Sequence, residues 1–242
     1  MIISAIRTVT TYVAVSLYVL VVGPPGMLLA ILFRWKSLLY GLGHFGVRLA
    51  LFTTGITFRV TGREHVPLDR AAVYCSNHQS NVDPPILFDA LHPRMHILYK
   101  HEIDQIPILA RAFRLGGFIP VDRRNREASL RSIENGASSI RSGNSFLIFP
   151  EGTRSRTGDL LPFKKGGFIM AIQAQVPIVP VAISGGRAAM RKGSPIVRPV
   201  KVNVRIGKPV PTTGLTLDDR DELIALVRGE VAKLLREGPI WT

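Results

Sequence analysis

Short apolar runs alternate with longer amphipathic segments from about residue 57 to the end of the chain. The apolar runs predict strands, because they are rich in Val, Ile and Phe and are bounded by turn-forming residues. Between them, apolar positions recur at the spacing of a helix face. This alternation predicts an α/β domain with a mixed, largely parallel sheet flanked by helices. The predicted strands cover 57–61, 71–75, 95–99, 118–121, 146–149, 178–183 and 200–206, and the predicted helices cover 103–115, 127–141, 165–175 and 218–236.

The N-terminal part of the chain shows a different pattern. Residues 8–33 carry no charge and are rich in Val, Leu and Ile, and a second mostly apolar stretch covers 38–58. About 20 apolar residues suffice to cross a bilayer, so the first stretch is long enough. Two glycines and two prolines at 23–26 predict a break or sharp bend between a longer arm at 2–22 and a shorter one at 27–33.

This N-terminal segment has three interpretations. A helical hairpin or bent helix buried in one leaflet and a single spanning anchor both fit, and the sequence does not separate them. A cleaved signal peptide is disfavoured, because no small-residue cleavage site follows at the usual distance. If the segment spans, Arg34 and Lys36 outnumber Arg7 and leave the rest of the chain on the cytoplasmic side. We therefore expect membrane-associating helices at 1–56, an α/β domain at 57–242, and a location at the cytoplasmic face of the cell membrane.

The chain has a formal net charge of +14. Such an excess of positive charge favours an anionic partner: nucleic acid, a lipid headgroup surface, a phosphorylated substrate or an acidic carrier protein. Nucleic acid is disfavoured, because the basic residues are scattered and no aromatic platform for base stacking is interleaved with them. Cys75 is the only cysteine, so a disulfide framework and a thiolate zinc site are excluded. We expect no metal site and no cofactor.

A polar turn follows the apolar run at 71–75 and contains a histidine and a carboxylate, His78 and Asp83. On an α-helix, five residues turn a side chain about 140° away, so the two meet only across a turn. Asn77, Ser80 and Asn81 favour such a turn. In a catalytic interpretation, neutral His78 takes the proton of an alcohol as its oxygen attacks a carbonyl carbon. Asp83 then holds the tautomer of the histidine ring.

A plainer interpretation of Asp83 is also open. Asp83 precedes Pro84, which is a typical helix start with Asp as N-cap and Pro at the first helical position. The two roles are compatible, because one carboxylate oxygen can cap the helix while the other accepts from the histidine ring. Ser80 as a nucleophile is disfavoured, because in a turn beside His78 it more readily stabilises the backbone.

Three further segments carry candidate chemistry. At 149–155, a β-turn is the plain interpretation, whereas in a functional one Gly152 lets a ligand approach the backbone and Arg154 offers its guanidinium to phosphate oxygens. Glu151 then either positions Arg154 or binds a substrate hydroxyl. The run at 116–123 ends in Arg123, which is otherwise part of a solvated basic face. The run at 176–183 contains two prolines and predicts an edge strand or the wall of a pocket, whereas its apolar composition has burial in the core as the default interpretation.

Together, in order and spacing, these segments resemble the four sequence blocks of the glycerolipid acyltransferase family, of the 1-acylglycerol-3-phosphate O-acyltransferase type. The similarity covers residues 62–211. The matching positions are Asn77, His78 and Asp83 in the first block, Lys100, Glu102, Pro107 and the run ending at Arg123 in the second, 149–155 with 162–166 in the third, and 176–183 in the fourth.

The resemblance implies transfer of a fatty acyl group from acyl-CoA or acyl carrier protein to the 2-hydroxyl of lysophosphatidic acid, at an anionic membrane surface. It implies that His78 and Asp83 are catalytic. The residues that it assigns to binding the substrate are Arg123, Glu151, Gly152, Thr153, Arg154 and Lys100. Two rival hypotheses stay open: the same chemistry on another lyso-lipid acceptor, and a non-catalytic basic protein that binds membranes.

Overall fold

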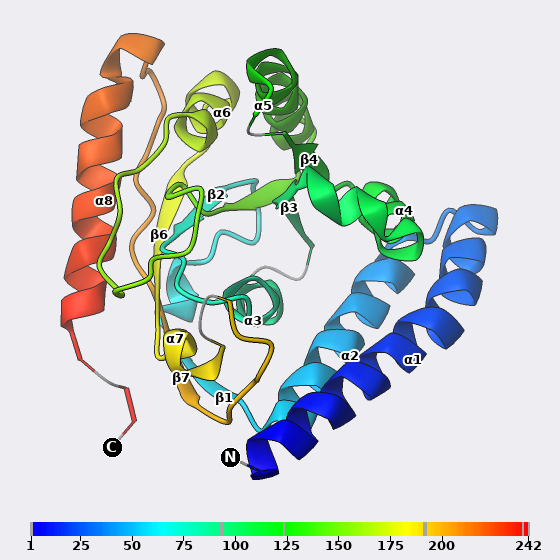
Figure 1. Ribbon diagram of the computed structural model, residues 1–242. Helices are drawn as coiled ribbons and strands as arrows, with labels where there is room; N and C mark the ends of the chain where they lie inside the picture. Colours follow the sequence, from blue (N-terminus) through cyan, green and yellow to red (C-terminus); the bar gives the residue numbers. More distant parts are fainter. Residues whose placement is uncertain (1, 92–93, 123, 191–192, 239, 242) are drawn as a thin grey trace.

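The computed structural model describes residues 2–91, 94–122, 124–190, 193–238 and 240–241. Its centre is one seven-stranded sheet with the strand order β1-β7-β6-β2-β5-β3-β4 (Figure 1). All seven predicted strands are present, with ends shifted by no more than two residues. The strands are β1 (Thr57–Thr61), β2 (Val73–Ser76), β3 (Met95–Lys100), β4 (Ile119–Val121), β5 (Ser145–Ile148), β6 (Ile178–Ser184) and β7 (Lys201–Ile206).

The sheet is mixed and largely parallel, as the sequence predicts. Only the β6–β7 pair is antiparallel among the strand pairs described. Strands β2 and β5 are buried at every position, because helices cover both faces of the sheet there. Buried strands of this kind read as continuous apolar runs, which is why the sequence revealed them.

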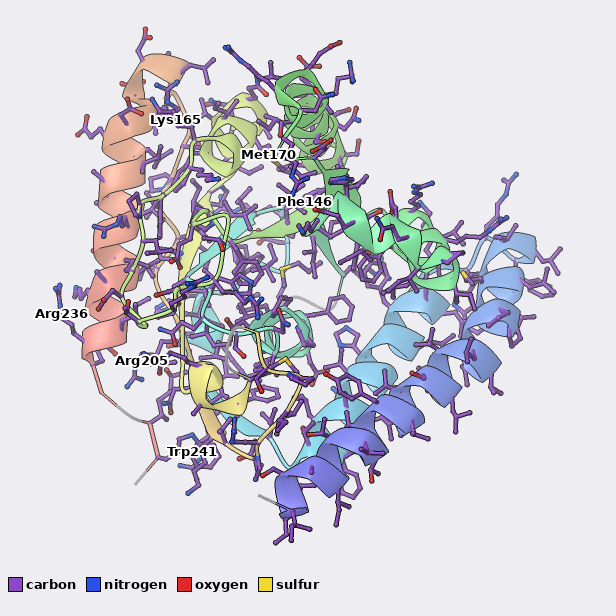
Figure 2. The ribbon with its side chains drawn as sticks, viewed as in Figure 1. Phe146, Lys165, Met170, Arg205, Arg236 and Trp241 are labelled. Atoms are coloured by element: carbon purple, nitrogen blue, oxygen red, sulfur yellow. The ribbon has the colours of Figure 1, made fainter. Side chains whose placement is uncertain are left out.

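Helices form a layer on each face of this sheet (Figure 1). On one face, α5 (Arg126–Arg141), α6 (Gly166–Ala174) and α8 (Arg220–Arg236) enclose a core that contains Phe146 and Met170, both labelled in Figure 2. The other face carries a second core under α3 (Asp83–Ala90) and the N-terminal helices. The remaining elements are α4 (Pro107–Leu115), α7 (Gly186–Ala189) and the short 3-10 helices η1 (Arg63–His65), η2 (His101–Gln105) and η3 (Leu217–Asp219).

The N-terminus forms a hairpin of two helices, α1 (Ile2–Leu32) and α2 (Lys36–Thr54), that pack along each other (Figure 1). Of the break or sharp bend predicted at 23–26, the break is absent, because α1 continues as one helix through Pro24 and Pro25. The flanking glycines serve packing instead. A Cβ on Gly26 would lie 2.4 Å from Leu42 Cδ1 on α2, and one on Gly23 would lie 3.3 Å from Ile108 on α4. Close contact with neighbouring helices thus supports a helix that loses two internal hydrogen bonds to proline.

Polar contacts fasten the start of the hairpin to the α/β domain. Thr8 Oγ1 accepts a hydrogen bond from Val197 N at 2.9 Å, and the Tyr12 hydroxyl donates to Pro195 O at 3.0 Å. Arg7 Nη1 donates to Thr54 O at 3.1 Å, which places its positive charge at the C-terminal end of α2. A cation there is favourable, because the last carbonyls of a helix carry partial negative charge.

A cluster of charged groups joins α2 to α3. His44 Nδ1 lies 2.9 Å and Arg48 Nε 3.0 Å from Asp89 Oδ1 at the C-terminal end of α3. The side chains of His44 and Asp89 are 18% and 8% exposed, so water screens this contact little, whereas Arg48 is 70% exposed and its contact is screened more. Together with the contacts of α1, they hold the hairpin flat against the domain over most of its length.

The outward face of α1 is apolar and exposed. Its members recur every three to four residues from Ile2 to Leu20 and again from Leu28 to Ile31, so they form one stripe along the helix. Among the described residues, α1 is the one helix long and apolar enough to span a membrane. The stripe comprises Ile2, Ile6, Val9, Val13, Leu17, Leu20, Leu28 and Ile31, each 45% exposed or more.

Strand β6 corrects a further prediction. The edge strand predicted from Pro177 and Pro180 is wrong, because β6 lies inside the sheet between β2 and β7. The default interpretation of this run as core is confirmed, because nearly all positions of β6 are buried. Pro180 is tolerated because the ladder beside it contains a bulge. Between the pairs Val181–Ile206 and Ile178–Val210, β6 advances three residues while the facing chain advances four. An extra residue interrupts regular pairing, so the missing N–H of Pro180 leaves no ladder bond unmade.

Strand β3 carries a buried histidine away from the candidate site. His96 is 7% exposed, its ring packs against Tyr40, Phe118 and Phe146, and a Cβ on Gly117 would lie 2.4 Å from it. Burial, and secondarily the positive charge of Lys36, lower the pKa of His96 to about 4. Folded protein therefore keeps this ring neutral at pH values where an exposed histidine is charged.

This burial predicts a pH-dependent stability. Between an ordinary pKa of about 6.5 and the folded value of about 4, the unfolded chain binds a proton at His96 that the folded chain does not. The free energy of unfolding contributed by His96 is thus fully present above this window and falls as the pH is lowered through it. Thermal unfolding of a His96→Phe variant should depend on pH less steeply between pH 7 and 5 than that of wild type. Parallel pH profiles would contradict the assignment.

Candidate active site

The predicted site residues gather at one edge of the sheet. Strands β2, β5, β3 and β4 are parallel neighbours, so their carboxyl ends meet there. His78 follows β2, Glu151 follows β5, and Lys100 is the last residue of β3. In α/β sheets this edge is the usual place of a binding crevice. Arg123 lies outside the described residues.

His78 and Asp83 meet across the polar turn, as expected. His78 Nδ1 lies 3.0 Å from Asp83 Oδ2. The same oxygen accepts the backbone N–H of Gln79 and of Ser80, each at 2.6 Å. Asp83 is fully buried, and a buried carboxylate requires such donors. Three donors from the turn thus converge on one oxygen atom, Asp83 Oδ2.

This hydrogen bond fixes which ring nitrogen of His78 is open to accept a proton. With Nδ1–H donated to a carboxylate, the neutral ring carries its lone pair on Nε2. Among the described residues no group hydrogen-bonds to Nε2, and the side chain is 16% exposed. The ring packs on Phe149 with centroids 4.3 Å apart, which limits its rotation. The arrangement is that of an oriented general base.

The helix-capping role predicted for Asp83 is wrong. Val82 occupies the N-cap position of α3 with no side-chain cap, and Asp83 points back into the turn instead. Pro84 and Pro85 explain why. Neither has an N–H, so the first turn of α3 offers fewer donors that need a cap.

Asn77 is a buried residue whose role sequence reasoning missed. Its Nδ2 donates to Ile183 O at 2.9 Å, and its Oδ1 accepts from Ile183 N at 2.8 Å. The amide thereby ties the end of β2 to the end of β6 just before the turn of His78. From the sequence, Asn77 is interpreted as a turn former and as a position of the first family block, not as a tie between strands. The signal that could have found it is a polar amide at the end of a buried strand, where burial demands hydrogen-bond partners.

Glu151 is 3% exposed and holds the backbone of two segments. Oε1 accepts from His78 N at 2.7 Å, and Oε2 accepts from Leu161 N at 3.1 Å. Burial raises the pKa of the Glu151 carboxyl, while these two backbone donors oppose the rise. Both carboxylate oxygens are therefore engaged by the protein itself.

The loop after β5 folds over the turn that carries His78. Ser155 N donates to His78 O at 2.9 Å, and Gln79 Nε2 donates to Gly158 O at 3.1 Å. Gly152 has a left-handed backbone (φ +68°), and the side chain of Lys164 lies directly over it. Glycine is needed at such a position because it has no Cβ. Thr153 and Arg154 continue this turn. Lys164, which the sequence analysis did not single out as a ligand-binding residue, places a further cation beside it.

Lys100 lies at the same edge but already has a partner. Its Nζ is 2.7 Å from Glu102 Oε1, and its side chain is 60% exposed. An exposed pair of this kind is weak, so it can exchange for a bound anion. Over the residues that the structure describes, no three His, Cys, Asp or Glu side chains are grouped as metal ligands.

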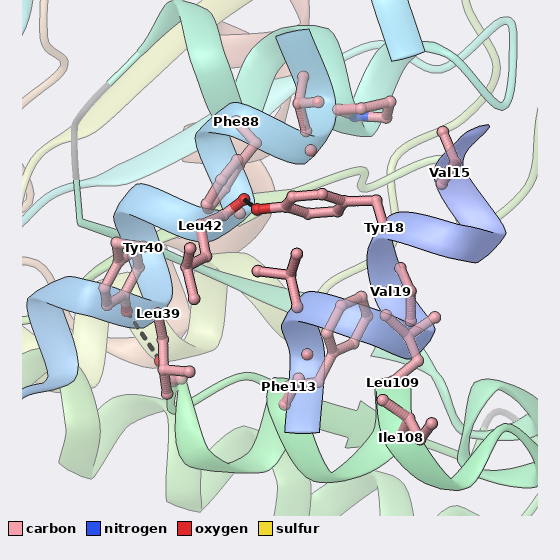
Figure 3. Close-up of a pocket in the computed structure, with 18 of the residues that line it drawn as sticks. Val15, Tyr18, Val19, Leu39, Tyr40, Leu42, Phe88, Ile108, Leu109 and Phe113 are labelled. Atoms are coloured by element: carbon pink, nitrogen blue, oxygen red, sulfur yellow. Dashed lines mark hydrogen bonds between the residues drawn. The ribbon is translucent and has the colours of Figure 1, made fainter. Parts of the chain in front are cut away.

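An apolar cavity of about 470 Å³ lies between the helical hairpin, α3 and α4 (Figure 3). Pro84 and Pro85, which directly follow Asp83, form part of its wall. The hydroxyls of Tyr18 and Tyr40 donate to Leu42 O and Gly116 O, so they leave the lining apolar (Figure 3). Volumes of about 300–1,000 Å³ are typical of ligand pockets. Other lining residues include Val19, Leu39, Gly46, Phe88, Leu109, Ala112 and Phe113.

The fold and site define an α/β transferase with a His–Asp pair beside an apolar cavity, and comparisons with known proteins identify its family. The acyltransferase family model matches residues 57–184. A 1-acyl-sn-glycerol-3-phosphate acyltransferase of Limnanthes douglasii is 34% identical over 207 residues, covering 84% of this chain and 73% of that protein. The human 1-acyl-sn-glycerol-3-phosphate acyltransferase alpha is 35% identical over 184 residues, covering 76% of this chain and 65% of its own length. The chain therefore belongs to the acyltransferase family.

A solved structure shares the whole fold. The 1-acyl-sn-glycerophosphate (LPA) acyltransferase PlsC of Thermotoga maritima superposes with a TM-score of 0.84 over 98% of this chain and 97% of the other, at 24% identity. The family explains the resemblance found in the sequence blocks, and it makes this chain an acyl-transferring enzyme. The N-terminal hairpin is part of the shared fold, because the superposition extends beyond the family model.

The contacts of Glu151 predict that it acts by holding the site together. In Glu151→Gln, an amide NH₂ replaces one acceptor oxygen and faces a backbone N–H. A hydrogen bond to a charged group contributes about 1.5–3 kcal/mol. If its loss shifts the His78 backbone and raises the activation free energy by this amount, kcat should fall about 10- to 100-fold. The KM for the acyl acceptor should stay within about twofold, since a positioning residue does not touch substrate. Steady-state kinetics beside the exposed control Glu134→Gln measure both; an unchanged kcat with a raised KM would assign Glu151 to substrate binding instead.

Proposed function

We propose that this enzyme transfers a fatty acyl group from a thioester, acyl-CoA or acyl carrier protein, to the 2-hydroxyl of 1-acylglycerol-3-phosphate, giving phosphatidic acid. The observation that carries the proposal is the His78–Asp83 hydrogen bond, with Nε2 left open at the carboxyl edge of the sheet. The names of the relatives, 1-acyl-sn-glycerol-3-phosphate acyltransferases, support this acceptor.

The proposed mechanism is a single displacement. His78 Nε2 takes the proton of the glycerol 2-hydroxyl as its oxygen forms a bond to the thioester carbonyl carbon. Asp83 stabilises the imidazolium that results. The tetrahedral intermediate then collapses, the carbon–sulfur bond breaks, and His78 returns the proton to the thiolate that leaves. No acyl-enzyme is required.

Cations around the glycine turn would bind the phosphate of the acceptor. Arg154, with the backbone at Gly152 and Thr153, provides donors for phosphate oxygens, and Lys164 lies over the same turn. Lys100 and Arg123 extend this set in the proposal. Glu151 takes part by holding the backbone of His78 at the distance that the reaction needs.

The apolar cavity would hold the acyl chain. It is lined by the hairpin and by α4, and two prolines of its wall adjoin the catalytic carboxylate, so a chain in it can end near His78. The exposed stripe of α1 would lie in the lipid. Because contacts hold the hairpin flat against the α/β domain, a position in one leaflet fits better than a spanning one.

The membrane arrangement then follows the division of the chain. The helices at 1–56 associate with the membrane, and the α/β domain at 57–242 carries the catalytic groups. Arg34, Trp35 and Lys36 form the turn of the hairpin and suit the headgroup level, where basic and aromatic side chains are enriched. We propose the cytoplasmic face of the cell membrane as its location, because a chain with the single cysteine Cys75 suits a reducing compartment.

The catalytic pair predicts the behaviour of two variants. His78→Ala removes the base, and Asp83→Asn keeps the size of the side chain but removes its charge. Each should lower acyl transfer about 10²–10⁴-fold, the usual contribution of a general base. The assay follows thiol release and lipid product with both thioester donors and a panel of lyso-lipids with and without a free phosphate.

The same assay separates the rival hypotheses. A preference of wild type for a lyso-lipid with a larger headgroup would replace the proposed acceptor but keep the mechanism. Binding to anionic vesicles that is equal in wild type and His78→Ala, without thioester turnover in either, would support a non-catalytic membrane protein.

The cavity predicts control of chain length. Ala112→Phe adds an aromatic ring to the cavity wall, whereas Leu130→Phe changes an exposed position on α5. The first variant should shift the preferred acyl chain of the donor or acceptor toward shorter lengths, and the second should not. Competition between thioesters and lyso-lipids of graded chain length measures the shift. Identical preferences in the two variants would place the acyl chain elsewhere.

A further inference from the structure

Gly186 lies against the oxygen of Asp83 that His78 does not use. Asp83 Oδ1 is buried, and within the described part of the chain it has no hydrogen-bond partner. A Cβ built on Gly186 would lie 2.6 Å from this oxygen and 3.6 Å from both Ser80 Cβ and Val82 Cγ2. Cβ atoms do not approach other atoms this closely, so the contact is possible only for glycine.

The backbone does not demand glycine at this position. Gly185 before it has a left-handed backbone (φ +90°), but Gly186 does not. Gly186 is the first residue of α7, where a residue with a side chain has a higher helix propensity than glycine. The reason for glycine is therefore the space that Asp83 occupies, and this makes Gly186→Ala a test of that contact alone.

The position of Gly186 relative to Asp83 is fixed by the sheet. Gly186 lies two residues after Ser184, the last residue of β6, and β6 pairs with β2, which leads into the turn of His78. The Asn77 amide adds two hydrogen bonds between these strand ends, at Ile183. The turn after β6 consequently cannot withdraw from the carboxylate without breaking this pairing.

We propose that Gly186 is a positioning residue for the catalytic pair. By closing on Oδ1 without a side chain, the β6–α7 turn keeps water from this oxygen and holds the carboxylate in the one orientation in which Oδ2 receives all three N–H donors. This inference rests on the proposed role of His78 and Asp83. Its consequence is that a methyl group at 186 turns the carboxylate, and with it the His78 ring, while the substrate contacts stay intact.

The test compares Gly186→Ala with Gly229→Ala, a control on α8 where an added Cβ meets nothing within 4 Å. Gly186→Ala should lower kcat about tenfold or more and leave the KM for the acceptor within about twofold, because a displaced base slows the reaction and not the binding. Gly229→Ala should match wild type in both constants. An equal kcat in the two variants would overturn the proposal.

A second measurement shows whether the effect passes through Asp83. Thermal unfolding is followed for Gly186→Ala in the wild-type chain and in an Asp83→Ala chain. The loss of Tm caused by the methyl group should disappear in the second background, where no carboxylate is left to displace. This comparison of Tm values can be made even if Gly186→Ala alone is too unstable for an activity assay. An equal loss in both backgrounds would overturn the proposal. An inactive wild type would instead refute the proposed function, and the unfolding cycle would still test the contact.

Discussion

One buried carboxylate oxygen organises the turn that carries His78 and Asp83. Asp83 Oδ2 accepts hydrogen bonds from the ring of His78 and from the backbone of Gln79 and Ser80, in a place without solvent. A buried charge costs much free energy unless donors surround it, so the turn adopts the one conformation that supplies three. Ring tautomer, ring orientation and backbone path are therefore set together, before any substrate binds.

The rest of the fold keeps this turn in register with its neighbours. Asn77 joins the end of β2 to β6, and Glu151 joins the His78 backbone to the loop after β5. Each of these polar side chains is buried and bonds to backbone atoms of another segment. The site thus depends on the order of strands in the sheet, because that order makes the ends of β6, β2 and β5 adjacent.

The sequence predicted the features that local patterns encode. Strands β2 and β5 are apolar because both faces are buried, and the His78–Asp83 spacing fits a turn, so both were found. What depended on tertiary contacts was not. The break expected at Pro24 is absent because α2 and α4 pack against the flanking glycines. The edge position expected for β6 is wrong because a bulge opposite Pro180 interrupts the pairing where proline has no N–H to donate. Nothing local in the sequence distinguishes Gly186 from any other glycine after a strand.

The central claim is that His78 Nε2 removes the proton from the acceptor hydroxyl. The most direct measurement is a crystal structure of the enzyme with lysophosphatidic acid and no acyl donor, a complex that cannot react. In this complex the glycerol 2-hydroxyl oxygen should lie about 2.6–3.2 Å from Nε2, with the phosphate at the turn of Gly152 and Arg154. A complex in which the phosphate binds elsewhere and the hydroxyl points away from His78 would contradict it.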